Sequence, residues 1–387
     1  MPQTKRPARL WLPPLLALLV IRATGSFQLE APAAIGPAFT AGLGLDHAQI
    51  GMLMGAFMLP GIFITVAAGL LARRIGDRKV LLGGMLLMAA GAVLAAVAPG
   101  FPVLLAGRVL SGIGGVAMLM LVLKMTADRF AGPMLSTATS IVIVSWPIGF
   151  ALSLQVLGTL AATGDWRVLM LASGLPALAA TLLIPLVGQA LPMSASAGGT
   201  ETRPVRWQMI VAATMCWAAL NAGTAIMAGF LQGYLASIGV DTASAANRAS
   251  LCSWAFAVAT PFGGLIADRL IGRTQAVVLG TLATAAMFLL IPLTAGHPVS
   301  FVLLGVSIAL MPGALTAQLG AATPQAARAL VFGWYSAGSY LAITLIPWLA
   351  GALHDASGDA RAPVALGAAI MLASLPAYAW FRRTVSG

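Results

Sequence analysis

The sequence predicts an all-α membrane protein of twelve transmembrane helices, arranged as two related bundles of six helices. Apolar residues make up 60% of the 387 residues and charged residues only 8%, whereas a soluble domain carries about 25% charge. The phrase GLLARRIG at 69–76 returns as GLIADRLIG at 264–272, after 195 residues. So little charge cannot cover a soluble surface, and a repeat at half of the chain length indicates two related halves.

Each predicted span is a run of mostly apolar residues close to the length of about 20 that crosses a bilayer. The twelve runs cover residues 11–39, 49–71, 80–98, 102–124, 134–161, 167–188, 207–236, 247–267, 275–294, 298–320, 329–351 and 362–381. Prolines inside them, such as Pro32, Pro60 and Pro147, suit membrane helices, because neighbouring helices can satisfy the freed backbone groups. The first run follows basic residues at 5–9, as a signal peptide would, but its apolar character continues to Phe39, so we expect a membrane span.

Lysine and arginine are concentrated in alternate loops. With the N-terminus inside, the cytoplasmic segments carry 16 of them, and the outer segments carry only Arg167, Arg248 and Arg361. The positive-inside rule therefore predicts a multi-pass protein of the plasma (inner) membrane with both termini cytoplasmic. The net charge of +11 is spread over the ends of the apolar runs. It predicts a lipid bilayer as the surroundings and no nucleic-acid partner.

The residues 189–206 form the single long polar stretch and are rich in Ser, Gly and Thr, which is typical of a flexible linker. We therefore expect an N-terminal six-helix bundle at 1–188, a cytoplasmic linker at 189–206 and a C-terminal six-helix bundle at 207–387. We expect the chain to work as a monomer. A receptor or scaffold would usually bring a soluble sensing or docking domain, and no segment here is long enough for one.

The repeated phrase and three further motifs resemble those of the major facilitator superfamily, and the resemblance covers essentially the whole chain. The motifs are GRVLSGIG at 107–114 in the fourth span, WPIG at 146–149 in the fifth, and DWR at 165–167 before the sixth. The resemblance implies a transporter in which spans one, four, seven and ten line a central cavity. Within the family, residues 36–76 look most like bacterial members near the cyanate and nitrate/nitrite transporter groups.

The resemblance also implies a cytoplasmic gate made by the two copies of the phrase. In the family phrase the glycines allow close helix approach, and the charges pair across the seam between the halves in one conformation and separate in the other. The first copy has Arg73 where the family has Asp, so we expect Asp268 to supply the main acidic contact, with Asp77 as a possible stand-in. The alternative is that the basic residues are only topology anchors. The gate residues are Gly69, Arg73, Arg74, Gly76, Asp77, Arg78, Gly264, Asp268 and Arg269.

Three charged residues lie well inside predicted spans, where charge is costly and usually functional: Arg22, Glu30 and Arg108. At 1.5 Å per residue, Glu30 lies about 13 Å and Arg108 about 9 Å from the outer ends of their spans. We expect the two to approach each other or to share a water-filled site, with Glu30 carrying a coupling proton and Arg108 answering its charge. The alternative is a permanent ion pair between two helices. Lys124 falls at a span end, where we expect it to snorkel to the interface.

Arg22 lies nearer the inner half of the first span, and its planar guanidinium group suits a carboxylate or an oxyanion. The alternative is that it snorkels or donates to backbone carbonyls. Two arginines against one glutamate favour an anionic or neutral polar substrate. Gln28 and Asn221 complete the predicted substrate and proton site, and Asn221 is the strongest polar candidate. For the remaining candidates, packing or an interface position is the alternative to ligand contact: Gln232, Gln318, Trp146, Trp217, Trp254, Trp334 and Tyr335.

The sequence thus predicts a secondary active transporter that works by alternating access on a small anionic or polar solute, coupled to H⁺. The alternatives are an exporter of drugs or other hydrophobic compounds, and a passive facilitator. We do not expect an enzyme, a cofactor or a metal site, because His47, His297 and His354 are far apart in the sequence and lie at predicted outer loops or span ends. The chain also lacks the G-x-x-x-x-G-K-[ST] phrase of ATP-driven proteins.

Overall fold

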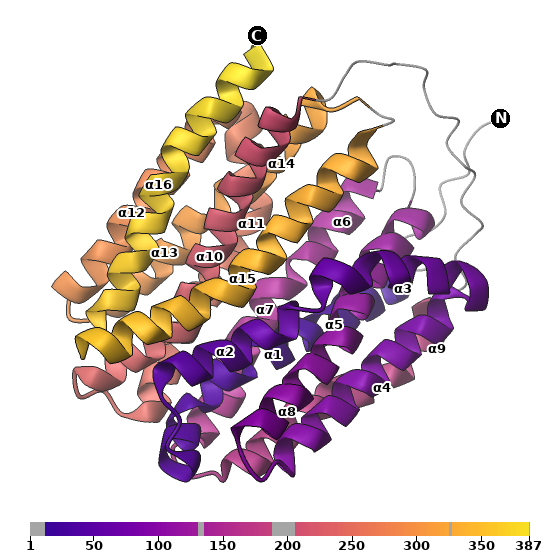
Figure 1. The fold of residues 1–387 in the computed structure, drawn as a ribbon. Coiled ribbons are helices and arrows are strands. Elements are labelled where there is room, and N and C mark those ends of the chain that lie inside the picture. The colour runs from indigo at the N-terminus through magenta and orange to yellow at the C-terminus, as the bar shows by residue number, and fades with distance from the viewer. Residues whose placement is uncertain (1–11, 131–134, 188–205, 325–326, 387) are drawn as a thin grey trace.

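The computed structural model describes residues 12–130, 135–187, 206–324 and 327–386, and helices dominate this part of the chain, which contains no strand (Figure 1). Twelve helical segments are long and apolar enough to cross a membrane, which confirms the predicted number of spans. The predicted linker at 189–206 lies outside the described residues except for Arg206, and the two bundle boundaries stay a prediction.

The first six spans are built from nine α-helices and two short irregular turns. These are α1 (Leu12–Leu43), α2 (His47–Met58), α3 (Gly61–Ile75), α4 (Asp77–Ala96), α5 (Phe101–Arg129), α6 (Leu135–Ile143), α7 (Ser145–Ser153), the π-helix η2 (Leu154–Gly158), α8 (Trp166–Ala180), the 3₁₀ turn η3 (Thr181–Leu183) and α9 (Ile184–Val187).

The last six spans follow from residue 207 onward. They are α10 (Trp207–Ser237), α11 (Thr242–Ile266) with the π-helix η4 (Ala267–Ile271), α12 (Arg273–Leu293), α13 (Pro298–Ala309), α14 (Met311–Ala322), α15 (Arg328–Ser357) and α16 (Arg361–Ser386).

Proline explains where spans two, five and ten break into two helices. Pro60 begins the second part of span two, Pro147 follows the break at Val144, and Pro312 follows the break at Leu310. A proline lacks the N–H that would bond to the carbonyl four residues earlier, and its ring crowds that carbonyl. The break in span five, at Val144, lies next to the carbonyls of Val142 and Ile143, which accept hydrogen bonds from Arg22.

Aspartates begin three of the spans at the predicted outer side. Asp46 accepts a hydrogen bond from the backbone of Gln49 at 2.7 Å, and the Gln49 side chain accepts in return from the backbone of Asp46. Asp165 and Asp241 accept from the backbone nitrogens two and three residues ahead. These caps satisfy N–H groups that a helix leaves free at its start.

The two sets of spans meet along α2 and α15 and along α7, η2 and α11. Glycines allow the first of these contacts: an added Cβ at Gly51 or Gly55 would collide with the backbone carbonyls of Pro347 and Thr344. In Figure 1, α15 crosses the molecule beside α2. The backbones of these two helices therefore touch without intervening side chains.

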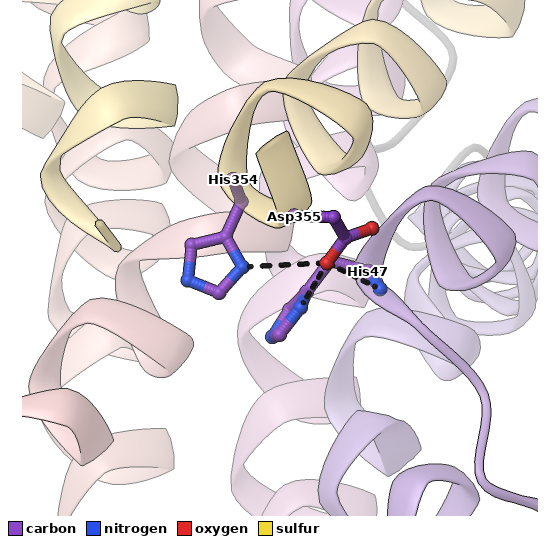
Figure 2. Close-up of side chains that lie close together, drawn as sticks. All are labelled: His47, His354 and Asp355. Atoms are coloured by element: carbon purple, nitrogen blue, oxygen red, sulfur yellow. Dashed lines mark hydrogen bonds and ion pairs between the residues drawn. The ribbon is translucent and has the colours of Figure 1, made fainter. Parts of the chain in front are cut away.

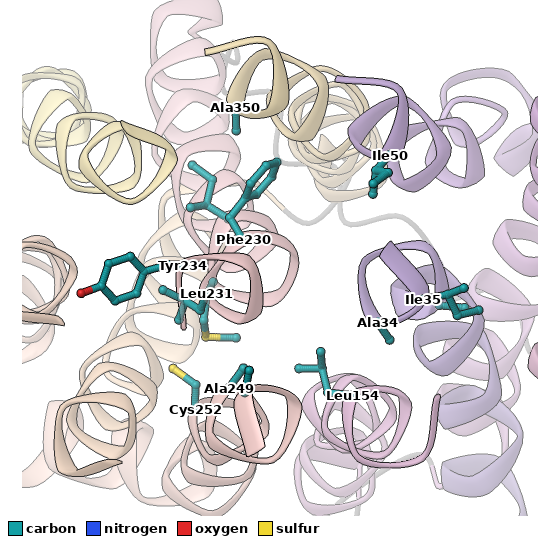
Figure 3. Close-up of a cluster of buried hydrophobic side chains, with 14 of the residues drawn as sticks. Ala34, Ile35, Ile50, Leu154, Phe230, Leu231, Tyr234, Ala249, Cys252 and Ala350 are labelled. Carbon is teal, nitrogen blue, oxygen red and sulfur yellow. The ribbon is translucent and has the colours of Figure 1, made fainter. Parts of the chain in front are cut away.

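An apolar cluster drawn from both sets of spans seals the molecule next to this contact. Figure 3 shows part of it, with Ala34 of α1 and Leu154 of η2 on one side and Phe230 and Leu231 of α10 on the other. All four side chains are buried. Burial of this apolar surface stabilises the conformation in which the two sets of spans are closed together at this end.

Candidate functional site

A cavity of about 780 Å³ lies between the two sets of spans. Residues of α3 and α14 contribute to its wall, so it lies at the end of the α2–α15 contact that is nearer to these helices. Its volume is within the range of ordinary small-molecule sites, about 300–1,000 Å³. Most of its wall is apolar, and the side chains of Trp146, Trp217, Phe256 and Trp334 contribute aromatic surface. A bulky organic solute would therefore find stacking surfaces on both sides of the cavity.

Aromatic contacts hold these walls in place. Trp217 stacks on Tyr335 with 4.8 Å between ring centroids and 15° between planes. Trp334 makes an edge contact with Trp207 at 5.9 Å. Trp146 lies 5.4 Å from the ring of Phe150. Tyr335 supports the wall from behind and does not line the cavity as described.

Arg22 is the one charged residue among the described residues that line the cavity. Its Nη1 donates to Ser145 Oγ at 3.0 Å and to the carbonyls of Val142 and Ile143, both at 3.4 Å. The Ile143 carbonyl is available because Pro147, four residues later, has no N–H to offer it. Arg22 therefore donates to backbone carbonyls, which is the alternative to an anion site that the sequence leaves open.

The hydrogen bonds of the Arg22 guanidinium group are incomplete, and the residue lines the cavity. Arg22 Nε has no hydrogen-bond partner in the described part of the chain. The guanidinium carbon lies 5.6 Å from the ring centre of Trp146. With the side chain only 9% exposed, its charge faces a poorly solvated, mainly apolar cavity. A fixed positive charge in such surroundings attracts an anion more strongly than the same charge in water.

Arg108 is fully buried and bonded to three backbone carbonyls. Its Nε donates to Leu53 at 2.9 Å, Nη1 to Gln28 at 2.8 Å and Nη2 to Leu29 at 3.1 Å. The Gln28 carbonyl is free to accept this bond because Pro32, four residues later, has no N–H to donate to it. Arg108 thus joins spans one, two and four through backbone atoms. The alternative expected from the sequence, a permanent ion pair with Glu30, is not found among the described residues.

Glu30 is fully buried on α1, and neither carboxylate oxygen has a hydrogen-bond partner among the described residues. Arg108 is near enough to interact with it electrostatically, without an ion pair. Burying a carboxylate with no hydrogen bond is expensive when the group is charged. A proton on Glu30 would relieve this cost.

The other predicted polar residues divide between the cavity and the bundle interior. Asn221 lines the cavity and donates from Nδ2 to the Trp217 carbonyl at 2.8 Å. Gln28 instead donates to the Met88 carbonyl at 2.9 Å and does not line the cavity. Gln232 is buried with both amide atoms unpartnered in the described chain. Gln318 accepts from Tyr378 at 2.9 Å, outside the cavity. Trp254, half-buried on α11, also lies outside its described lining.

Of the span-eleven residues that line the cavity as described, only Trp334 is among the candidates from the sequence. Ser336, Ser339 and Tyr340 line it together with Gly333 and Ile343. They recur at three- and four-residue steps, which places them on one face of a helix. Small and polar residues on one face of an apolar span indicate a face that lines a cavity, and this pattern is visible in the sequence.

The two aspartates of the predicted gate, Asp77 and Asp268, pair with basic residues of their own set of spans in this conformation. Lys124 Nζ bonds to Asp77 Oδ2 at 2.7 Å and to Asp128 Oδ2 at 3.0 Å, so it is ion-paired rather than only snorkelling. Asp268 Oδ1 accepts from Arg273 Nε at 2.6 Å. The remaining basic gate side chains are exposed or at the surface: Arg73, Arg74, Arg78 and Arg269. This arrangement agrees with a seam that is open at the gate end.

The gate glycines serve different purposes. Gly76 and Gly272 adopt nearly the same backbone conformation, with φ 94° and ψ 145° in one and φ 84° and ψ 147° in the other. Residues with a side chain rarely adopt a positive φ, so glycine is needed at the end of each copy of the phrase. A Cβ at Gly69 would meet only the end of Met120. The close approach expected at Gly264 is found instead at Gly263, which lies against the Ala309 carbonyl.

The second copy of the phrase is one residue longer than the first, and the structure accommodates the extra residue in the π-helix η4. A π-turn holds one residue more than an α-turn and commonly marks functional positions. The widened turn contains Asp268. The two copies therefore differ in backbone as well as in charge.

Asp268→Asn is expected to lower the transport rate more than Asp77→Asn, by up to about fivefold, as for the loss of one exposed charge contact. After Asp77→Asn, Lys124 still has Asp128, whereas Asp268 is the acidic residue that occupies the family position of the phrase. Initial rates of uptake into proteoliposomes, at matched protein content, measure the difference. The reverse order would contradict the unequal gate.

The expectation of scattered histidines is wrong for two of the three. His47 and His354 lie side by side and share contacts with Asp355 (Figure 2). His297 stays apart as the cap of α13. The contact joins residues more than 300 positions apart, which no local pattern in the sequence predicts.

Solved structures of membrane transporters share this fold over nearly the whole chain. A bacterial homologue of the human lysosomal transporter Spinster, inward-facing and unoccupied, superposes with a TM-score of 0.74 at 16% identity and covers 99% of this chain and 98% of its own. The inward-open xylose transporter XylE of Escherichia coli gives a TM-score of 0.73 at 15% identity, over 94% of this chain and 95% of its own. These likenesses establish the fold.

Two curated relatives are similar in sequence over parts of the chain. The 3-(3-hydroxy-phenyl)propionate transporter of Escherichia coli K12 is 30% identical over 195 residues, which is 50% of this chain and 47% of that protein. The inner membrane transport protein YajR of the same strain is 32% identical over 115 residues, or 30% of this chain and 25% of its own. The alignments thus span about half or less of these relatives.

The family model that matches is that of the Major Facilitator Superfamily, over residues 16–235 and 211–387. Together the two matches cover nearly all of the chain and both copies of the gate phrase. The chain belongs to the Major Facilitator Superfamily of membrane transporters.

Proposed function

We propose that the protein is a secondary active transporter of small organic anions. An aromatic or other bulky carboxylate fits its cavity best, and its transport is coupled to H⁺. The observation that carries the proposal is the cavity of about 780 Å³, whose described lining has aromatic walls and a single charged residue, Arg22. A positive fork beside tryptophan rings suits a molecule with a carboxylate at one end and an apolar body at the other.

The similarity to a 3-(3-hydroxy-phenyl)propionate transporter supports the same class of substrate, over half of the chain. The narrower resemblance to cyanate and nitrate/nitrite transporters finds no support in the relatives described. A tiny inorganic anion would also leave most of this apolar cavity unused.

Coupling to H⁺ rests on Glu30, which is buried and unpartnered among the described residues. Opening the α2–α15 side would hydrate this carboxylate, whereas closing it removes the water. A group that alternates between these surroundings can take a proton on one side and lose it on the other. A D-xylose–proton symporter is among the proteins of similar fold.

The side of the membrane to which the cavity opens follows from the predicted topology. With both termini cytoplasmic and the protein in the inner membrane, the cavity opens toward the cytoplasm, and the bundles 1–188 and 207–387 rock about it as one monomer. The gate phrases then lie on the open side, where their charges pair within each half.

The apolar lining also favours a second candidate, export of hydrophobic compounds. Such a site would not need the carboxylate of its ligand and would bind a neutral analogue equally well. A passive facilitator is the third candidate, and it differs in not needing Glu30 to exchange a proton.

Binding of 3-phenylpropionate, 3-phenylpropionamide and 3-phenylpropylamine separates these candidates, since the three share a body and differ in charge. Trp146, Trp217 and Trp334 line the cavity, so quenching of tryptophan fluorescence reports binding. We expect the carboxylate to bind about ten- to a hundredfold more tightly than the amide, as for one hydrogen-bonded charge of 1.5–3 kcal/mol. We expect Arg22→Gln to remove that preference.

Arg167→Gln is the matched control, because Arg167 stacks on Trp166 at 4.3 Å and does not line the cavity. Its binding should equal that of the unaltered protein. Equal affinity for the amide and the carboxylate would favour the hydrophobic exporter, and tighter binding of the amine would contradict the anion site.

A further inference from the structure

A cluster of two imidazoles and a carboxylate joins the two sets of spans at the closed end of the molecule. His47 is the first residue of α2, and His354 and Asp355 lie in the last turns of α15 (Figure 2). Nδ1 of His47 lies 2.7 Å from Asp355 Oδ1, and Nδ1 of His354 lies 3.7 Å from the same oxygen. Both imidazoles therefore direct a nitrogen to one point.

Backbone hydrogen bonds fix the position of the carboxylate. Asp355 accepts from the backbone nitrogen of His47 at 3.2 Å and from that of Ala48 at 2.8 Å. These are free N–H groups at the start of α2, where the helix dipole also favours a negative charge. Replacing the His47 side chain leaves both of these bonds intact.

His354 has a nitrogen that the surrounding chain does not use. Its Nδ1 is buried and lacks a hydrogen-bond partner among the described residues. The two imidazole rings lie only 3.7 Å apart between centroids, at 72° to each other. Both Nδ1 atoms face the same carboxylate oxygen, so the three side chains can supply ligand atoms to one ion.

The distances suit a tetrahedral metal ion. Nitrogen and carboxylate ligands lie about 2.0–2.2 Å from zinc, which places any two of them about 3.3 Å apart. The two measured separations, 2.7 and 3.7 Å, fall on either side of that value, and ligand atoms of all three residues lie within 4.8 Å of one another. Side-chain rotations that also move the two rings apart would equalise them.

We propose that His47 Nδ1, His354 Nδ1 and Asp355 Oδ1 bind a divalent metal ion of the zinc class, with water as the fourth ligand. His47 would then carry its proton on Nε2, which leaves the Nδ1 lone pair for the ion. Imidazole ligands select zinc, copper or nickel over magnesium and calcium. The His47 side chain is 44% exposed, which gives an ion access from solvent. Asp359 lies close enough to His354 to interact electrostatically and adds negative charge nearby.

The metal would act as a conformational lock. Its ligands come from both sets of spans, so the site is complete only while α2 and α15 are packed together. Gly351, one turn before Asp355, lies against the His47 carbonyl and holds this register. A bound ion therefore stabilises the conformation with the cavity open at the opposite end.

Zinc binding to the purified full-length chain, freed of any histidine tag, tests the site directly by calorimetry. We expect one zinc ion per chain, and binding about tenfold or more weaker after His47→Gln or His354→Asn, as for loss of one metal ligand. His297→Asn is the matched control, since His297 caps α13 and asparagine also caps helices. Gel filtration confirms that each variant is folded. Unchanged binding in the two ligand variants, or loss in the control, would overturn the proposal.

A labelling experiment tests the lock without a known substrate. Thr224→Cys places a thiol in the cavity, whereas the native Cys216 and Cys252 are buried. Zinc should raise the rate of maleimide labelling at position 224 by about threefold or more, as for a shift of conformational populations, and have no effect when His354→Asn is added. A rate that zinc does not change, in protein shown to bind zinc, would overturn the lock.

Discussion

Leucine in place of Gly55 is expected to slow the transport cycle strongly, because it hinders the close packing of α2 against α15. An added Cβ at Gly55 would collide with the Thr344 carbonyl, which is backbone and cannot rotate away. Overpacking of this kind costs about 1–3 kcal/mol, which lowers the population of the closed form about five- to 150-fold. Gly51→Leu should act in the same way through the Pro347 carbonyl.

Two measurements check this prediction. Initial uptake of labelled 3-phenylpropionate into proteoliposomes should fall about tenfold or more, and labelling of a cysteine at Thr224 from the cavity side should slow. Gly83→Leu is the control, because nothing lies near its added Cβ and it does not line the cavity. Normal uptake by Gly55→Leu would show that the tight α2–α15 contact is dispensable.

Glu30→Gln is expected to abolish accumulation of solute against its gradient while leaving solute binding in place. Glutamine has nearly the shape of glutamic acid but cannot release a proton, so the solute flux should lose its link to the pH gradient. The Arg22 site lies eight residues away on α1, or about 12 Å along the helix, and should keep its affinity.

Asp165→Asn is the matched control, because Asp165 lies outside the spans and asparagine caps a helix as well as aspartate does. Accumulation that survives Glu30→Gln would remove Glu30 from the coupling mechanism. A failure of the unaltered protein itself to accumulate solute under a pH gradient would favour the passive facilitator.

The spans were predictable because hydropathy alone decides whether a segment crosses a bilayer. The breaks in them are also visible in the sequence, at Pro60, Pro147 and Pro312. Charges are harder to place. Depth along the span brings Glu30 and Arg108 to similar levels, but which group the arginine binds depends on carbonyls in neighbouring helices.

Proline links these observations. Pro32 frees the Gln28 carbonyl for Arg108, and Pro147 frees the Ile143 carbonyl for Arg22. Each proline is readable in the sequence, whereas its arginine partner on another helix is set by packing. The same limit applies to His47 and His354, which meet only because α2 and α15 pack together.

The repeated phrase has the same backbone feature in both copies, because Gly76 and Gly272, which end the copies, share one conformation. The π-helix that absorbs the extra residue of the second copy is a feature of the backbone that composition does not indicate. The two copies of the predicted gate phrase therefore share a final glycine but differ in their charges and in the helical turn before it.

The most direct test of the proposed function is accumulation of labelled 3-phenylpropionate by proteoliposomes under an imposed pH gradient. We predict accumulation above the external concentration, collapse to equilibrium when a protonophore removes the gradient, and loss with Arg22→Gln. Accumulation that is equal without a gradient or unchanged by Arg22→Gln, or accumulation of 3-phenylpropylamine instead, would contradict a proton-coupled transporter of organic anions.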